Sequence, residues 1–394
     1  MAAGRGGRLL GGLFLAAFGA ALALGMLEVG VRVLHLVPDR FWQPDPKLGT
    51  VLVPGASGWW TQEEHEFFVP IRINAAGRRD LDRTPQKPPG TFRILLLGDS
   101  FVEALQVPIE QTFARALEQR LTADAGRPVE VVSMGVSGYG TAAEYLWYRD
   151  VGRSFGPDLV LLSFYPGNDV RNNSPILEPT LRPVYAPDGT PDHIAGGKGG
   201  EGGGRGLLGR SAAYQYARKV VLTRQPALAA RLAGWGLLDA QALRPVPMEQ
   251  GVPVDYGVFA VHPSPAWQDA WAHTEATLAA LRDAVRADGA TLVIMVVTAR
   301  EQVYPDDWTQ LQATYPAMRE QSWDLNGPER RVLSWCALND VPCVPLSPAF
   351  VAARDNAPRL HWHFDGHWTP AGHALAAETM AAALQPAVRN AEGR

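Results

Sequence analysis

A serine follows a long apolar run near residue 100. Residues 93–98 have the sequence RILLLG, and Asp99 and Ser100 come directly after them. An unbroken apolar run that ends in a turn predicts a strand buried on both faces of a parallel sheet. Ligands bind in the crevice outside the carboxyl ends of such strands, so a hydroxyl exposed there can attack a bound substrate. Ser100 is therefore the candidate nucleophile.

Two more apolar runs end in small or polar residues. Residues 129–134 and 158–164 predict the second and third strands, which are followed by Gly138 and Asn168. The carboxyl ends of parallel strands meet at one edge of a sheet, so both residues are expected near Ser100. A glycine N–H and an asparagine amide beside a nucleophile supply the donors of an oxyanion hole.

A simpler interpretation exists for each of these polar residues. Taken alone, Gly138 would make a tight turn and Asn168 would cap a helix. Asp99 and Asp169 are expected to hold their loops through backbone hydrogen bonds. The coincidence of three strand ends favours the catalytic interpretation over the structural one.

A candidate base lies near the carboxyl end of the chain. Asp365 and His367 precede an alanine-rich helix predicted to reach about Leu384, with Thr369 as its N-cap and Pro370 in its first turn. A Ser-His-Asp relay needs a histidine to take the serine proton and a carboxylate to orient that histidine. We therefore predict that His367 is the base and Asp365 its partner.

The same segment allows a metal site as an alternative. Residues 360–373 contain four histidines, and His361 and His363 would share one face of a strand, as zinc ligands can. No other cluster of ligand residues in the sequence completes such a site. We therefore expect no metal and no other cofactor, with His361, His363 and His373 packed in the core or placed at a rim.

These motifs, in this order, resemble those of the SGNH, or GDSL, hydrolases. Residues 98–101 (GDSF) are similar to the first block of that family, residues 135–141 to its second, residues 167–169 (GND) to its third, and residues 365–367 (DGH) to its last. The last block is Asp-x-His-Trp instead of Asp-x-x-His, which is similar to the envelope branch that acetylates or deacetylates exopolysaccharides. The second block has Ser133 where an asparagine often stands.

The resemblance implies a flavodoxin-like three-layer α/β/α sandwich with a parallel sheet. It also implies Ser100 as nucleophile, His367 as base, Asp365 as its partner, and Gly138, Asn168 and the Ser100 N–H as the oxyanion hole. The helices and strands that we expect to complete this fold lie at residues 109–123, 141–155, 266–287, 291–297 and 341–346.

The N-terminus contains a segment long enough to cross a membrane. Residues 9–27 are apolar or small and follow Arg5 and Arg8, and about 20 such residues span a bilayer. A cleaved signal peptide is the alternative, because residues 21–23 (ALA) offer a cleavage site. Apolar character continues past that site, and Glu28 can pair with Arg32 one turn later. We expect an uncleaved anchor with the remaining chain outside the cytoplasm, on the periplasmic side.

The sequence thus predicts three segments, at residues 1–37 (anchor), 38–90 (juxtamembrane linker) and 91–390 (hydrolase domain with an insertion at 172–262). Within the linker, residues 67–74 predict an edge strand, and its aromatics are expected on the membrane interface or on the domain. Within the insertion, residues 195–206 are glycine-rich and residues 211–238 predict one or two amphipathic helices. The insertion is either a lid or acceptor-binding element or a plain surface insertion.

Composition restricts the class of partner. The net charge of −4 is spread without long runs, so we expect no nucleic acid partner. Cys336 and Cys343 could close a small loop, but neighbouring unpaired core cysteines are the commoner case and are expected here. The predicted function is a serine esterase that cleaves an O-acyl ester, with acetyl expected, from a small molecule or glycan. The alternatives are an O-acyltransferase for an envelope polysaccharide and a non-catalytic binding module.

Overall fold

The computed structural model describes residues 3–37, 39–62, 64–178, 182–185, 191–195, 211–238 and 247–390. Contacts within the chain define two compact units, which we call the N-terminal unit (Met1–Asp39 and Gly200–Pro245) and the sheet unit (Arg40–Gly199 and Val246–Arg394). Part of the predicted insertion therefore groups with the N-terminal helix. The functional boundaries at residues 37 and 90 stay a prediction.

A five-stranded parallel sheet is the centre of the sheet unit. Its strands are β5 (Phe92–Gly98), β6 (Val129–Gly135), β7 (Leu159–Phe164), β12 (Thr291–Val296) and β13 (Cys343–Pro345). They lie in the order β13-β12-β7-β5-β6, and every neighbouring pair is parallel. Numbered along the chain this order is 2-1-3-4-5, the flavodoxin-like order. The predicted sheet is confirmed.

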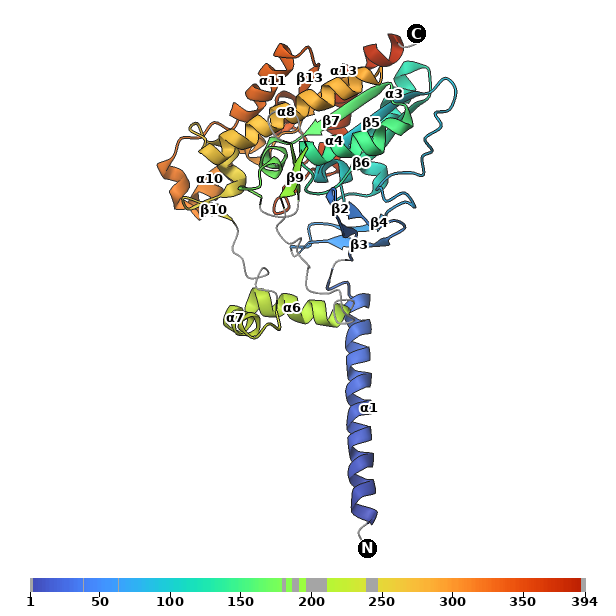
Figure 1. The fold of residues 1–394 in the computed structure, drawn as a ribbon, viewed down its shortest axis with the longest axis vertical. Coiled ribbons are helices and arrows are strands. Elements are labelled where there is room, and N and C mark those ends of the chain that lie inside the picture. Colours follow the sequence, from blue (N-terminus) through green and yellow to red (C-terminus); the bar gives the residue numbers. More distant parts are fainter. Residues whose placement is uncertain are drawn as a thin grey trace. The chain divides into compact units, whose positions relative to one another are not determined.

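Helices cover both faces of this sheet (Figure 1). Alternate residues of β5 point to opposite faces, so Ile94 and Leu96 belong to one apolar cluster and Leu95 and Leu97 to another. The first cluster includes α3 (Phe113–Ala125), α12 (Ser347–Ala353) and α13 (Pro370–Asn390), and the second includes α4 (Thr141–Asp150), α8 (Pro265–Ala287) and α11 (Gly327–Leu338). The predicted α/β sandwich is confirmed.

Two predicted helices are divided in the structure. The first is a 3-10 turn (Ile109–Gln111) followed by α3, because Thr112 adopts an extended conformation and its hydroxyl accepts a hydrogen bond from the Arg115 N–H. The second is α4 followed by a 3-10 turn (Gly152–Phe155). A Cβ at Gly152 would lie 2.6 Å from the Leu95 side chain, so only glycine lets the chain approach the sheet this closely.

The predicted linker folds as two antiparallel hairpins within the sheet unit. They are β1–β2 (Trp42–Asp45 and Gly49–Leu52) and β3–β4 (Ser57–Thr61 and Phe68–Arg72). Phe41, Leu52 and Ile73 are at most 1% exposed in a cluster that includes Tyr139 and Leu146 near and on α4. Phe41, Phe67, Trp42 and Trp60 of this segment thus pack on the domain, whereas Phe68 is 49% exposed.

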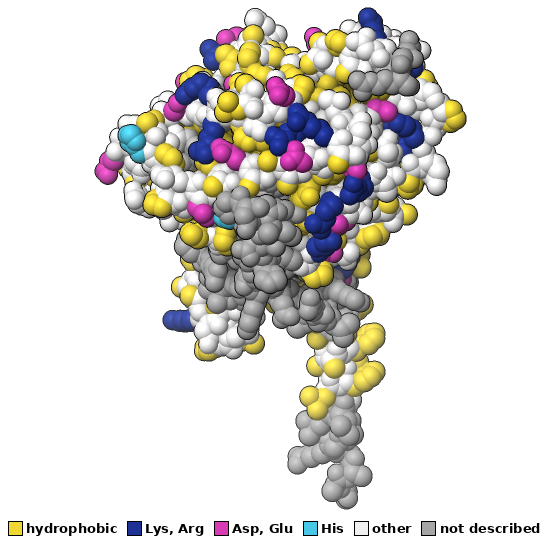
Figure 2. All heavy atoms as spheres, turned by 45° about the horizontal axis from the view of Figure 1, so that its top comes forward, with side chains coloured by type: hydrophobic (Ala, Val, Ile, Leu, Met, Phe, Trp, Pro, Cys, Tyr) yellow, Lys and Arg dark blue, Asp and Glu magenta, His cyan; other side chains and the backbone are white. Residues whose placement is uncertain are grey.

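The N-terminal unit contains α1 (Ala3–Val33), α6 (Ala212–Arg224) and α7 (Pro226–Gly234). Residues Gly11–Val33 have a mean hydropathy of 2.0, so the helix is long and apolar enough to cross a membrane, as an anchor or as a signal sequence. Figure 2 shows its apolar side chains exposed along the helix. Two helices occupy residues 211–238, as predicted, whereas the glycine-rich residues 196–206 lie outside the described residues.

The expectation of unpaired cysteines is wrong, because Cys336 and Cys343 form a disulfide. The two residues lie at the end of α11 and in β13, and the turn between these elements brings their Cα atoms to 6.2 Å.

The remaining elements are short: α2 (Ser100–Glu103), α5 (Pro166–Asp169), Arg171–Asn173, β8 (Arg182–Tyr185), β9 (Pro191–Ala195), β10 (Met248–Glu249), β11 (Val252–Pro253), Val254–Phe259, α9 (Arg300–Val303), α10 (Pro305–Thr314) and Pro316–Glu320.

Candidate active site

Ser100 lies at the carboxyl end of the central strand β5, where it begins α2. Asp99 caps this helical turn, since its Oδ1 accepts a 2.8 Å hydrogen bond from the Phe101 N–H. The turn packs closely against the neighbouring strand ends, and a Cβ at Gly135 would collide with the backbone of Glu103. The serine is therefore held at the sheet edge by a rigid turn.

His367 connects Ser100 to Asp365. Its Nε2 lies 2.7 Å from Ser100 Oγ, and its Nδ1 lies 2.7 Å from Asp365 Oδ1. Asp365 Oδ1 also accepts a 3.2 Å hydrogen bond from the His367 N–H, which fixes the two residues in one turn. The three side chains predicted from the sequence thus form a continuous hydrogen-bonded series.

Neighbouring carboxylates raise the pKa of His367. Burial alone would lower this pKa, but the hydrogen bond and charge of Asp365, with the charges of Asp99 and Glu103, outweigh burial. Burial alone would raise the pKa of Asp365, but the hydrogen bonds and the charge of His367 outweigh burial, so this pKa lies below its usual value. The pair therefore favours an ionised aspartate beside a histidine that readily takes a proton.

The two predicted oxyanion residues differ in position. Asn168 lies within the helical turn α5 after β7, lines the pocket described below and donates a 2.7 Å hydrogen bond from Nδ2 to Asp99 Oδ2. Gly138 has a φ of +75°, which favours glycine, and its carbonyl accepts a 2.9 Å hydrogen bond from Asn172. Among the described residues, Gly138 does not belong to the lining of that pocket. The structure brings Asn168 and His367 into this lining, whereas Gly138 and Ser100 both lie outside it.

Buried carboxyls surround the serine turn. Asp99, Glu103, Glu144 and Asp169 are each at most 1% exposed. Burial raises the pKa of Glu103 to about 7. Burial, followed by the charge of Asp99, raises the pKa of Glu144 well above its usual range, and burial with the charges of Glu144 and Asp99 does the same for Asp169. As predicted, Asp169 also holds its loop, accepting a 2.7 Å bond from the Tyr165 N–H.

Two side chains from other elements hold the loop that carries Asp365. Glu66, in the turn between β3 and β4, accepts hydrogen bonds from the N–H groups of His363 (2.6 Å), Phe364 (2.9 Å) and Asp365 (3.0 Å). Arg300 donates to the His363 carbonyl from the other side. Three N–H groups and one carbonyl of this loop thus have side-chain partners, which hold its backbone in place.

The other histidines of the segment pack as expected. His361 and His373 are at most 1% exposed, and burial lowers the pKa of each to about 3, so both are neutral. His373 Nδ1 accepts a 3.1 Å hydrogen bond from the Phe113 N–H at the start of α3. His363 is exposed at the rim. Within the described residues, no group of three or more His, Cys, Asp or Glu is arranged to hold a metal.

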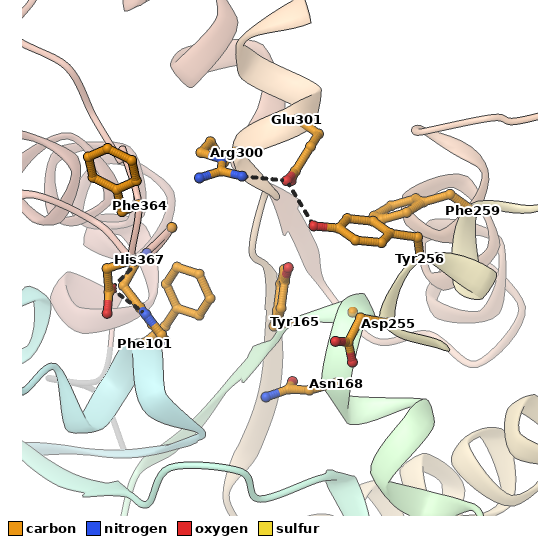
Figure 3. A pocket seen from close by; sticks show the side chains of 13 residues that line it. Phe101, Tyr165, Asn168, Asp255, Tyr256, Phe259, Arg300, Glu301, Phe364 and His367 are labelled. Atoms are coloured by element: carbon orange, nitrogen blue, oxygen red, sulfur yellow. Dashed lines mark hydrogen bonds and ion pairs between the residues drawn. The ribbon is translucent and has the colours of Figure 1, made fainter. Parts of the chain in front are cut away.

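A pocket of about 250 Å³ opens beside His367 (Figure 3). Its lining includes the aromatic side chains of Phe101, Tyr165, Tyr256, Phe259 and Phe364. Opposite His367, the Glu301 carboxylate forms an ion pair with Arg300 at 3.1 Å and lies 3.5 Å from the Tyr256 hydroxyl. Figure 3 shows these three side chains connected to one another. The pocket therefore offers apolar walls with polar groups at two sides.

Sequence reasoning missed Glu66, Tyr256, Arg300 and Glu301. Tyr256 follows β11 (residues 252–253), and Arg300 follows the sheet strand β12 (residues 291–296). Its position after a strand of the parallel sheet could have indicated Arg300. Glu66 lies 297 positions before His363 in the sequence, and no local pattern relates the two residues.

Comparisons with known proteins add a family and a set of similar folds. Residues 260–394 match the family model described as an SGNH hydrolase-like domain, acetyltransferase AlgX, so the match includes Asp365 and His367 but not Ser100. No curated protein matches the chain.

Several solved structures are similar to the chain at low identity. The acetyl xylan esterase AlAXEase is 13% identical over 74% of this chain and 100% of its own, with a TM-score of 0.38. Axe2, an acetylxylan esterase from Geobacillus stearothermophilus, is 12% identical over 73% and 92%, with a TM-score of 0.38. A GDSL-like lipase from Bacteroides thetaiotaomicron is 12% identical over 76% and 88%, with a TM-score of 0.34.

Proposed function

We propose that this chain, which carries an SGNH hydrolase-like domain and is an esterase or an acyltransferase, cleaves an O-acyl ester through Ser100, His367 and Asp365. The observation that carries the proposal is the hydrogen-bonded series from Ser100 Oγ to His367 Nε2 and from His367 Nδ1 to Asp365, at 2.7 Å in both steps. This is the arrangement that general-base activation of a serine needs.

In the proposed reaction, Ser100 Oγ attacks the ester carbonyl carbon while its proton moves to His367 Nε2. Asp365 remains ionised and stabilises the imidazolium. The carbonyl oxygen becomes negative and accepts hydrogen bonds from the Ser100 N–H and the second Nδ2 hydrogen of Asn168, whose first hydrogen is used on Asp99. Collapse of the intermediate breaks the C–O bond, and the leaving alcohol takes the proton from His367.

The acyl-enzyme is then resolved by a second nucleophile. A water molecule or an acceptor hydroxyl gives its proton to His367 and attacks the acyl carbon. The bond between Ser100 Oγ and the acyl carbon then breaks, and Ser100 Oγ takes the proton from His367. Gly138 stays in the proposal as a third oxyanion donor through its backbone N–H, on the strength of its motif and its left-handed φ of +75°. The same residues therefore serve hydrolysis and transfer.

The size and lining of the pocket support a short acyl group such as acetyl. At about 250 Å³ the pocket is smaller than the 300–1,000 Å³ that binds drug-sized ligands. The aromatic side chains around it suit the apolar faces of a sugar ring, so an acetylated glycan or small molecule is the proposed substrate.

We further propose that α1 anchors the chain in a membrane with the sheet unit outside the cytoplasm, because Arg5 and Arg8 precede the span.

Transfer of the acyl group to a polysaccharide hydroxyl is the second candidate function. The observation that favours it is the match of residues 260–394 to a family model whose description names the acetyltransferase AlgX. In that case the acyl-enzyme at Ser100 would react with a sugar hydroxyl in preference to water.

Labelling with a serine-directed fluorophosphonate tests the enzyme proposal. We expect the wild-type chain to be labelled and to turn over a short-chain ester, and Ser100→Ala to lose labelling and to lose turnover by roughly 10³-fold or more. Ser334→Ala, at an exposed residue of α11, is the matched control and keeps its labelling. A folded wild-type chain that is not labelled would contradict the proposal and favour a non-catalytic glycan-binding module.

A second experiment separates hydrolysis from transfer. Ester turnover is measured on acetylated glycans and on short- and long-chain acyl esters, with and without a deacetylated glycan acceptor. Hydrolysis predicts free acid at the same rate in both conditions. Transfer predicts that the acceptor accelerates turnover and becomes acetylated. A preference for long-chain esters would contradict the short acyl group inferred from the pocket.

A further inference from the structure

The helices α6 and α7 are attached to the end of the apolar helix α1 through Glu28. Glu28 Oε2 accepts hydrogen bonds from Ser211 Oγ (2.7 Å) and the Ala213 N–H (2.9 Å), and its Oε1 accepts from the Ala212 N–H (2.9 Å). A carboxylate on the first N–H groups of a helix satisfies donors that have no partner inside the helix. Arg32 pairs with the same carboxylate, as the sequence suggested.

The position of Glu28 along α1 places this junction at a membrane surface. Arg8 and Glu28 are 20 residues apart within one helix, which corresponds to about 30 Å at 1.5 Å per residue, the thickness of the hydrocarbon core. If α1 spans the bilayer, charged residues stand at both of its boundaries. Figure 1 shows α6 extending sideways from the end of α1, so α6 would then run along the membrane plane.

The side chains of α6, α7 and the following turn suit such a surface. Leu228, Trp235 and Leu237 are 42%, 71% and 64% exposed, although they are large and apolar. Residues 211–238 contain four basic residues and no acidic one, while the whole chain has a net charge of −4. Exposed leucine and tryptophan together with basic side chains are typical of helices that lie in the interface of anionic bilayers.

We propose that α6 and α7 lie in the membrane interface, with Leu228, Trp235 and Leu237 inserted among the lipids and the basic side chains near anionic headgroups. The inference rests on the proposed membrane anchor and goes beyond the ester chemistry. It assigns a role to this part of the insertion: α6 and α7 bind the chain to the membrane surface at a second site, in addition to the span α1.

Fluorescence from single-cysteine variants tests the proposal. Cys336 and Cys343 are bonded to each other, so Leu228→Cys and Leu237→Cys each add one reactive thiol for an environment-sensitive dye. Val261→Cys, at an exposed apolar residue of the sheet unit, is the matched control. The full chain is reconstituted into vesicles of phosphatidylcholine and phosphatidylglycerol, with and without lipids that carry a spin label near the headgroup.

We expect dyes at positions 228 and 237 to shift to shorter wavelength and to lose emission to the spin label, and the dye at position 261 to do neither. Vesicles without phosphatidylglycerol should reduce the quenching. Dyes with water-like emission on vesicles that carry the chain would overturn the proposal. A blue shift without quenching would also overturn it, because a protein surface would then cover the helices. A chain that fails to float with the vesicles would contradict the anchor as well.

Discussion

The charge of Asp365 decides at which pH His367 can accept a proton from Ser100. Only neutral imidazole acts as a base, and the negative charges around His367 raise its pKa above the usual value of 6.5. The proposed mechanism therefore predicts that kcat/KM falls as the pH drops through this raised pKa, which places the acidic limb above about pH 6.5.

Asp365→Asn separates this electrostatic role from a packing role, because the amide has nearly the same shape. We expect kcat to fall by roughly 10²- to 10⁴-fold. Loss of the negative charge removes the largest contribution that raises the pKa of His367, so the acidic limb should move to lower pH. The pH dependence of kcat/KM measures both effects. Asp355→Asn, at an exposed residue, is the control, and an unchanged acidic limb in Asp365→Asn would contradict the assignment.

At the scale of elements, the loop before α13 depends on the hairpin β3–β4. Glu66 is one contact between them, beside the rings of Phe67 and Trp362, whose centroids lie 5.5 Å apart. Hydrogen bonds to Glu66 from three backbone N–H groups and from Gln62 outweigh the effect of burial and lower its pKa. A group with a lowered pKa stabilises the folded state above its unfolded pKa, and that contribution is lost as the pH falls through the folded pKa. Glu66 therefore keeps holding the loop at neutral pH.

Glu66→Gln should leave at least one of the three N–H groups without an acceptor, because an amide presents one oxygen and two donor hydrogens. A hydrogen bond to a charged group contributes about 1.5–3 kcal/mol, so we expect kcat and the fluorophosphonate labelling rate to fall about 10-fold with little change in KM when the carboxylate is replaced. Glu64→Gln, two residues earlier and exposed, is the control. Near-UV circular dichroism identical to wild type, with full activity, would show that the contact does not position the site.

The buried carboxyls join α2, α4 and α5 beneath the serine, and Glu144 illustrates their energetic cost. Neither of its oxygens has a hydrogen-bond partner among the described residues. Its pKa is raised in the folded state, so between the unfolded pKa near 4.5 and the folded pKa the native protein holds the extra proton. Stability therefore falls as the pH rises through this range.

Glu144→Gln removes this titration. The difference in free energy of unfolding between the variant and wild type should change in favour of the variant as the pH rises above the unfolded pKa of Glu144. Urea unfolding at several pH values measures the difference. Glu320→Gln, at an exposed carboxylate, should show no such trend. A constant difference across the pH range would mean that Glu144 is not protonated in the folded state.

At the scale of the whole molecule, charge and apolar surface lie in different units. Basic and acidic side chains are interspersed on the face of the sheet unit that Figure 2 shows, whereas α1 exposes apolar residues such as Phe14, Phe18 and Leu24. Exposed apolar surface of this extent is costly in water and favourable in lipid. The anchor interpretation thus predicts an intact N-terminus in the membrane.

The intact mass of the chain purified from membranes measures this directly. We expect a mass that includes residues 1–23, retention in the membrane after an alkaline carbonate wash, and digestion of the sheet unit by protease added from the extracytoplasmic side. A chain that begins after Ala23 and appears in the soluble fraction would identify the segment as a cleaved signal peptide.

The sequence by itself determined the parallel sheet, the helices on its faces and the motifs at its edge. Each of these features is local: the short apolar run that ends in a turn before Ser100 predicts a buried strand, and Thr369 and Pro370 define the start of α13. Parallel strands end at one edge, which placed Ser100 and Asn168 together, and the position of His367 just before the last helix predicted it beside them.

Only the tertiary structure decided what holds and surrounds these residues. The contact of Glu66 with the loop at residues 363–365, the contact of Arg300 with the His363 carbonyl and the attachment of α6 to Glu28 are individual contacts of polar groups. Residues 66 and 363, or 28 and 212, are separated by long stretches of chain, so no hydrophobic period or turn signal relates them. Such contacts follow from how complete elements pack, and packing depends on the whole chain at once.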